Sequence, residues 1–199
     1  MRFTLSIAIG FSLLTGLSAQ TLNRSVVAQT EVSSEEYEVY DAAIDDLFVD
    51  GKASSNNAGK IAVKTLVIMD RTRPSLPEEF GREPGVGNPI SPSLEANANY
   101  RRMNQQSATL KRSFKPKIQF VMFNNKTNAL ESNSAPELKE SANWQTITLS
   151  RIGFNSSHTE AVFSMSYWCG GLCGGGFAFY IVKENGLWKV NRKSALWEA

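Results

Sequence analysis

Histidine and cysteine are scarce in this sequence, and their scarcity excludes several kinds of site. The chain has one histidine, His158, and two cysteines, Cys169 and Cys173. A structural zinc site takes about four ligands, and covalent haem attachment takes a Cys-x-x-Cys-His run. A serine nucleophile would need a general base, but His158 lies in a polar Asn-Ser-Ser-His-Thr stretch that is typical of a surface turn. The sequence therefore predicts no metal, no cofactor and no catalytic residues.

An excess of one charge is also missing. The chain has 21 lysines and arginines against 19 acidic residues, a net charge of +2, whereas nucleic-acid-binding domains are strongly basic. We therefore expect no nucleic-acid partner. The charges are nevertheless segregated, because residues 31–50 hold eight acids and no base, and residues 101–117 hold six bases and no acid. We interpret these segments as two solvated faces that lie near each other, with electrostatic capture of a partner as the alternative.

The N-terminus carries an apolar run over residues 3–17, directly after Arg2. This is the layout of a secretory signal peptide, and the run is shorter than the roughly 20 apolar residues of a membrane span. Cleavage is predicted after Ala19 or after Ala28, so residues 1–28 are signal peptide and leader; an uncleaved N-terminal anchor is the alternative. We expect a secreted or periplasmic protein without a transmembrane segment after cleavage.

Two segments are predicted to be helical. Ser33 and Glu36 fit a capping box, and the apolar residues that follow them have helical spacing up to Asp50. Residues 93–110 form the second predicted helix. Between the two helices, residues 61–69 are typical of a strand.

Proline and glycine gather in one region of the chain. Residues 71–92 contain five of the seven prolines, which predicts a long irregular loop. A loop of this length inside a domain is usually functional or disordered.

The last third of the sequence has the alternation of β-strands. Asn185-Gly186 is a strong hairpin signal, because both residues tolerate positive φ. Alternation predicts that one face of these strands is buried and the other is solvated. The sequence therefore predicts a single α+β domain over residues 33–199, in which two helices pack on a mostly antiparallel curved sheet of five to six strands that ends in a C-terminal β-meander. The predicted strands are Lys117–Phe123, Trp144–Phe154, Ala161–Cys169, Phe177–Val182 and Gly186–Asn191.

The stretch from Cys169 to Gly176 combines two cysteines with five glycines. In an exported protein, two cysteines four residues apart at a turn predict a disulfide, and the glycines let the backbone fold tightly enough to form it. A thioredoxin-type redox pair would have two residues between the cysteines instead of three. Anion binding by the glycine-rich loop would require a helix start or a phosphate-loop lysine.

This stretch also carries a resemblance. Together with Ser150–Asn155, Ala161–Phe163 and Asn185–Val190, residues Cys169–Gly176 resemble the C-terminal part of uncharacterised exported bacterial proteins. The Asn-Gly-Leu-Trp-Lys-Val ending is also similar to the last hairpin of cystatin-like and nuclear-transport-factor-like domains. That second resemblance implies helices packed in the concave face of a curved antiparallel sheet, and the loop at 71–92 departs from it.

Four residues are candidates for binding: Asp70 and Arg71 at the start of the long loop, and Tyr167 and Trp168 beside the cysteines. The leading hypothesis is a non-enzymatic binding or envelope-associated domain whose partner is a small ligand or an envelope or secreted protein. One alternative is a secreted hydrolase that uses carboxylates near Asp70. Another is an inhibitor that inserts the Cys169–Cys173 tip into a secreted hydrolase.

Overall fold

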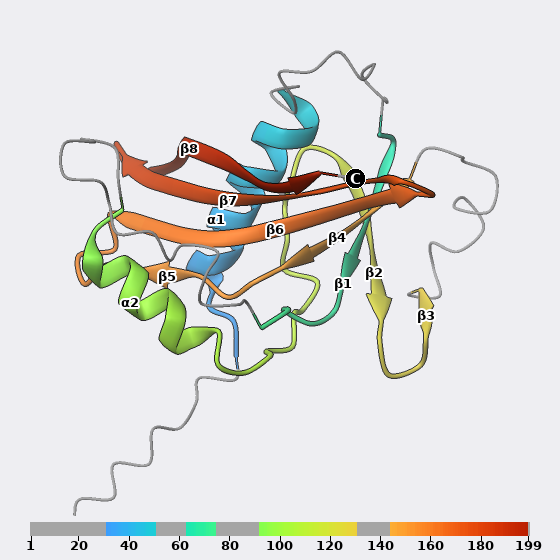
Figure 1. Ribbon diagram of the computed structural model, residues 1–199, viewed down its shortest axis with the longest axis horizontal. Helices are drawn as coiled ribbons and strands as arrows, with labels where there is room; N and C mark the ends of the chain where they lie inside the picture. Colours follow the sequence, from blue (N-terminus) through green and yellow to red (C-terminus); the bar gives the residue numbers. More distant parts are fainter. Residues whose placement is uncertain (1–30, 51–62, 75–91, 131–143, 199) are drawn as a thin grey trace, which may run out of the picture.

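The protein is built on one mixed β-sheet with a helix on each face (Figure 1). The computed structural model describes residues 31–50, 63–74, 92–130 and 144–198. The predicted signal peptide and leader and most of the predicted loop, residues 75–91, lie outside these ranges. The elements are α1 Ser34–Ile44, the π-helical turn η1 Asp45–Val49, β1 Thr65–Met69, α2 Leu94–Met103, β2 Gln119–Asn124, β3 Ala129–Leu130, β4 Trp144–Leu149, β5 Gly153–Phe154, β6 Glu160–Gly170, β7 Cys173–Glu184 and β8 Leu187–Glu198.

The sheet has eight strands in the order β3-β2-β1-β4-β6-β7-β8, with β5 paired to β6. Strand β1 runs parallel to β2 and β4, and all the other pairs are antiparallel. The α+β prediction and the C-terminal meander β6-β7-β8 are confirmed. The expected five to six strands fall short of eight, because the two-residue strands β3 and β5 are too short to show a period in the sequence.

Helix α1 begins as the sequence predicts. The Ser33 hydroxyl accepts the Glu36 N–H at 3.2 Å, and the Glu36 carboxylate accepts the Ser33 N–H at 2.9 Å, which completes the capping box. The buried side of α1 covers one face of the sheet, where the Tyr40 and Phe163 ring centroids lie 5.3 Å apart.

Helix α2 covers the opposite face. The Tyr100 hydroxyl lies 3.3 Å from that of Ser164, and Ser164 and Phe163 point to opposite sides of β6. The helix packs so closely that a Cβ on Gly153 would lie 2.3 Å from the Ala96 carbonyl oxygen. Helices on opposite faces differ from the one-sided packing that the cystatin-like resemblance implies.

Helix α2 ends at Met103, and the prediction that it continues to residue 110 is wrong. The Asn104 amide donates to the carbonyls of Tyr100 and Arg151, both at 2.9 Å, and so stops the helix. After Asn104 the chain turns and runs beside the first residues of the predicted loop. There the Thr72 N–H donates a hydrogen bond to the Ala108 carbonyl at 2.9 Å.

The predicted strand over residues 144–154 is interrupted at Ser150–Ile152. Arg151 leaves the sheet to bind Glu36, with Nε and one terminal nitrogen 2.8 and 3.0 Å from the two carboxylate oxygens. Both residues are buried. A buried arginine needs such a partner, and the sequence of this segment does not reveal that partner.

The alternation predicted for β6 is also only partly right. Ala161–Met165 is buried on both faces, because α1 covers one side and α2 the other. Beyond Ser166, where α2 no longer covers the sheet, Trp168 is exposed. The sheet therefore has an open face near the β6–β7 turn.

The acidic and basic segments contact each other, and two carboxylates of the acidic segment, Glu36 and Asp46, are buried instead of solvated. Lys111 forms an ion pair with Glu31. The backbone N–H groups of Lys115 and Lys117 donate to Asp41 and Asp45 at 2.9 and 2.8 Å. Carboxylates of α1 and η1 thus accept hydrogen bonds from the backbone of an irregular segment. No helix in the described ranges is long and apolar enough to cross a membrane.

Candidate functional site

The β6–β7 hairpin ends in a turn that is closed by a disulfide. Cys169 and Cys173 are bonded, with their Cα atoms 5.2 Å apart, which confirms the prediction. Gly170 and Gly171 have φ of 94° and 55°, a backbone conformation that favours glycine. Leu172 stands at the tip with 91% of its surface exposed.

Three glycines follow the disulfide on β7, and aromatic rings lie against two of them from the same side. A Cβ on Gly174 would be 2.8 Å from Cε3 of Trp168, and one on Gly176 would be 2.2 Å from Nε1 of Trp197. Any larger residue at these positions would displace the indoles. The glycine run therefore provides the space in which the two rings lie close to the backbone of β7.

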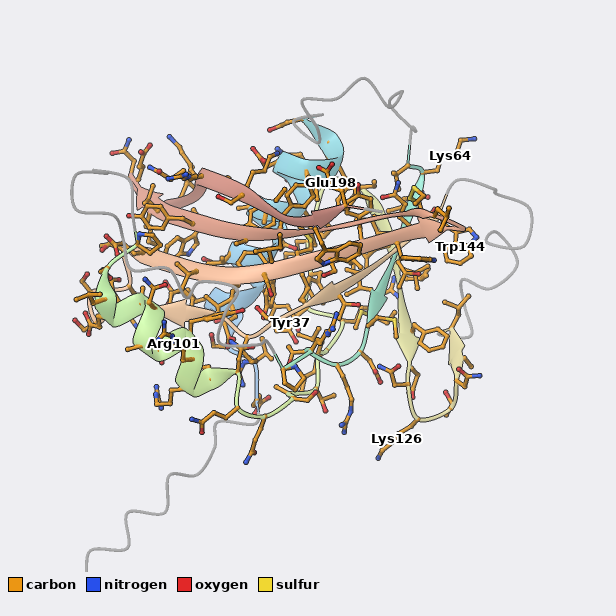
Figure 2. The ribbon with its side chains drawn as sticks, in the orientation of Figure 1. Tyr37, Lys64, Arg101, Lys126, Trp144 and Glu198 are labelled. Atoms are coloured by element: carbon orange, nitrogen blue, oxygen red, sulfur yellow. A yellow bond between two sulfur atoms is a disulfide. The ribbon has the colours of Figure 1, made fainter. Side chains whose placement is uncertain are left out.

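Three tryptophans share the open face of the sheet. Thr146 is the cross-strand partner of Trp168, so Trp144, two residues before it on β4, points to the same face. We call Trp144, Trp168 and Trp197 the tryptophan row. Their exposed fractions are 43%, 46% and 38%. Figure 2 shows Trp144 near the end of the sheet where the β6–β7 hairpin turns.

Tyr167 and Trp168 point to opposite faces of β6, as the alternation of a strand predicts. Tyr167 points to the opposite face, where its ring stacks on that of Phe177 and meets that of Phe48 edge-on. Partial burial raises the pKa of the Tyr167 hydroxyl, and the Glu198 carboxylate adds to the shift. Tyr167 therefore supports the hairpin from the core side, whereas Trp168 faces solvent.

Sequence reasoning missed Trp144 and Trp197 as partners of Trp168. Of the three, Trp168 alone is among the predicted binding residues, and Trp144 and Trp197 lie far from it along the chain. The alternation on β4 and the Gly174-Gly175-Gly176 spacing are the signals that could have placed their indoles on one face.

Asp70 and Arg71 lie away from the tryptophan row. Residue 70 is five residues beyond Thr65, which pairs with Trp144, a distance of about 17 Å along a strand. The Asp70 carboxylate accepts the backbone and side-chain N–H groups of Asn125 at 3.1 and 2.8 Å. Arg71 is exposed. Asp70 therefore holds the β2–β3 turn, and the structure does not bring this pair to Tyr167 and Trp168.

His158 is part of a surface cluster with a structural role. Its Nδ1 lies 2.6 Å from a Glu35 oxygen, and its ring stacks on Phe154 at 4.9 Å. The hydroxyls of Ser156 and Ser157 contact Glu95 and Thr159 instead of His158. Among the described residues, no serine is therefore paired with this histidine as a nucleophile.

An acidic cleft of about 550 Å³ lies between α1 and the β7–β8 turn. Burial raises the pKa of its Asp41 carboxyl to about 6, while the Lys115 N–H works against the shift. Asp46 is 2.9 Å from the Lys193 ammonium, and Trp188 forms part of the wall. Within the described ranges, no group of three or more histidine, cysteine or acidic residues is arranged to hold a metal ion.

Comparison with known proteins adds no further information. No protein-family model matches the chain, and neither do the curated proteins or the solved structures. A functional assignment therefore depends on the geometry of the chain itself, and the tryptophan row is its most distinctive exposed surface.

Proposed function

We propose that this protein is an exported, non-enzymatic binding domain that attaches to envelope material through the tryptophan row. The observation that supports this function is the exposure of three indoles on one face of a sheet whose nearby turn is closed by a disulfide. Isolated exposed apolar side chains are ordinary, but a group of them on one face marks an interaction site.

Export is part of the same proposal. The signal-peptide pattern of residues 1–28 predicts a secreted or periplasmic location. The Cys169–Cys173 disulfide supports it, because such bonds persist in oxidising compartments. The disulfide also limits the motion of the turn beside Trp168, so less conformational entropy is lost on binding.

The test is co-sedimentation of the purified mature protein with envelope material from its own host. Trp168→Ala should reduce the pelleted fraction severalfold, whereas the matched control Leu187→Ala, which truncates an exposed apolar residue on the β7–β8 turn, should not. Equal sedimentation of wild type and Trp168→Ala would contradict the proposal. Release of soluble fragments that is abolished by Asp70→Asn would favour the hydrolase alternative instead.

The hairpin tip supports a second candidate function, inhibition of a secreted hydrolase. Its basis is Leu172, which is almost fully exposed on a turn that the disulfide closes, as an inserted residue would be. Inhibition that is lost on reduction and on Leu172→Ala, but retained in Trp144→Ala, would favour this function over the first.

A further inference from the structure

The tryptophan row crosses the sheet along a diagonal. Trp168 on β6 pairs with Thr146 and Gly174, and Trp197 on β8 pairs with Gly176. With strands about 4.8 Å apart and a rise of about 3.4 Å per residue, the Cα atoms of Trp144 and Trp168 are separated by about 8 Å and those of Trp168 and Trp197 by about 12 Å. The Trp168 and Trp197 rings lie over Gly174 and Gly176, which are about 7 Å apart along β7. The line from Trp144 to Trp168 and the line from Trp168 to Trp197 run in nearly the same direction. The tryptophan row therefore matches an elongated ligand better than a compact one.

Two of the three indoles, those of Trp168 and Trp197, lie close to the sheet. Three atoms of the Trp197 ring would lie within 2.9 Å of a Cβ on Gly176, and two atoms of the Trp168 ring within 3.3 Å of one on Gly174. Rings held against the backbone present an aromatic surface to solvent instead of projecting as wedges. Such a surface accepts a flat ligand by stacking, whereas insertion into a bilayer or a protein cavity favours projecting side chains.

The surface between the indoles carries no charge. The outward-facing positions next to Trp168 are Thr146, Ser166, Gly174 and Gly176. None of them is ionisable, and the two hydroxyl-bearing side chains are partly exposed. Charge complementarity therefore selects an uncharged ligand that can exchange hydrogen bonds with hydroxyl groups.

We infer that the tryptophan row binds an uncharged glycan chain. The C–H faces of pyranose rings would stack on the electron-rich faces of the indoles, and their hydroxyls would hydrogen-bond to Thr146 and Ser166. A chain of several sugars is expected, because a single ring cannot reach all three tryptophans. This inference rests on the proposed function and specifies the ligand class of the same surface.

The experiment is calorimetric titration of the mature protein with cello- and chito-oligosaccharides from disaccharide to hexasaccharide. In at least one series, affinity should rise with chain length. Trp168→Ala should lower the affinity for the longest oligomer at least about tenfold, which is the loss expected for a central aromatic contact. Trp144→Ala and Trp197→Ala should reduce the gain from chain length, and Leu187→Ala should match wild type.

Two further measurements make the outcome decisive. Trp168→Phe, which keeps a smaller aromatic face, should bind with intermediate affinity, and circular dichroism would verify the fold of each variant. No binding of either series, or binding unchanged by Trp168→Ala, would overturn the glycan inference.

If Trp168→Ala instead abolishes binding to neutral phosphatidylcholine vesicles, the proposed function stands with a lipid ligand. If the variant changes neither envelope, glycan nor vesicle binding, both proposals fail.

Discussion

At the scale of single residues, Asp41 is the clearest case of a side chain whose ionisation opposes folding. It lies on α1 and faces the segment that follows α2, where the Lys115 N–H donates to one of its carboxylate oxygens. The other oxygen is buried without a hydrogen-bond partner among the described residues. Burial raises the pKa of Asp41 from 3.8 to about 6, and the neighbouring Asp45 and Glu38 carboxylates contribute to this increase.

We predict that Asp41→Asn stabilises the protein above about pH 6. Because the folded-state pKa is raised, the stability contributed by protonated Asp41 is fully present below about pH 4 and is lost as the pH rises through about 6. The shift would correspond to about 3 kcal/mol for a fully buried group. Since Asp41 is partly exposed, we expect about 1 kcal/mol.

Urea unfolding at about pH 4 and at about pH 8 measures this difference. The variant should gain stability over wild type only at the higher pH. Glu95→Gln, which removes an exposed carboxylate on α2 away from Asp41, is the control, and it should show no comparable pH dependence. The same gain for Asp41→Asn at both pH values would contradict the assigned cause.

At the scale of elements, the Glu36–Arg151 pair joins the start of α1 to the connection between β4 and β5. Glu36 serves two functions, because it completes the capping box and also receives the Arg151 guanidinium. Arg151 in turn accounts for the interruption of the predicted strand at residues 150–152. One ion pair therefore determines where a helix begins and where a strand ends.

We predict that Glu36→Gln lowers the free energy of unfolding by about 3–5 kcal/mol, because the buried Arg151 would lose its carboxylate. Chemical denaturation measures the loss. The control is Glu31→Gln, which removes the carboxylate of the exposed pair with Lys111 and should have no measurable effect. Similar effects for the two variants would show that the buried pair has no special role.

The edge strand β8 shows how the sheet avoids unwanted pairing. Its register against β7 shifts twice, between Gly176 and Phe177 and between Tyr180 and Ile181. Its middle carries Lys189, Arg192 and Lys193. Bulges and basic side chains on an edge strand hinder association with a second sheet. We therefore place the binding surface on the face of the sheet and not on its edge.

At the scale of the whole molecule, early and late parts of the chain stabilise each other. Lys183 on β7 lies 2.8 Å from Glu35 on α1, and Lys193 on β8 lies 2.9 Å from Asp46 in η1. The main apolar cluster includes residues of both helices and of β1, β2, β4, β5, β6, β7 and β8. Unfolding any of these elements would expose the others.

We therefore predict a single cooperative unfolding transition. Far-UV circular dichroism, which follows the backbone, and tryptophan fluorescence, which follows indoles on β4, β6 and β8, should have the same urea midpoint. Reduction of the disulfide should lower the stability by about 2 kcal/mol, because the closed loop is short, and should leave the fold intact. Two separated transitions would contradict a single domain.

The α+β class, the start of α1 and the Asn185-Gly186 turn could be predicted because they depend on short-range rules. The end of α2 could not, because Asn104 stops it by bonding to Arg151, 47 residues away. The two-sided burial of Ala161–Met165 also escaped prediction, because it depends on which helix covers which face. Of the four predicted binding residues, Trp168 alone lies in the tryptophan row.

The sequence by itself determined the C-terminal β-meander and the disulfide, because alternation, glycine content and cysteine spacing act over a few residues. Tertiary structure alone decided that Trp144, Trp168 and Trp197 share one face and that Asp70 stands apart. These relations depend on strand order and register, and the pairing of residues distant in the chain is set by how the whole core packs.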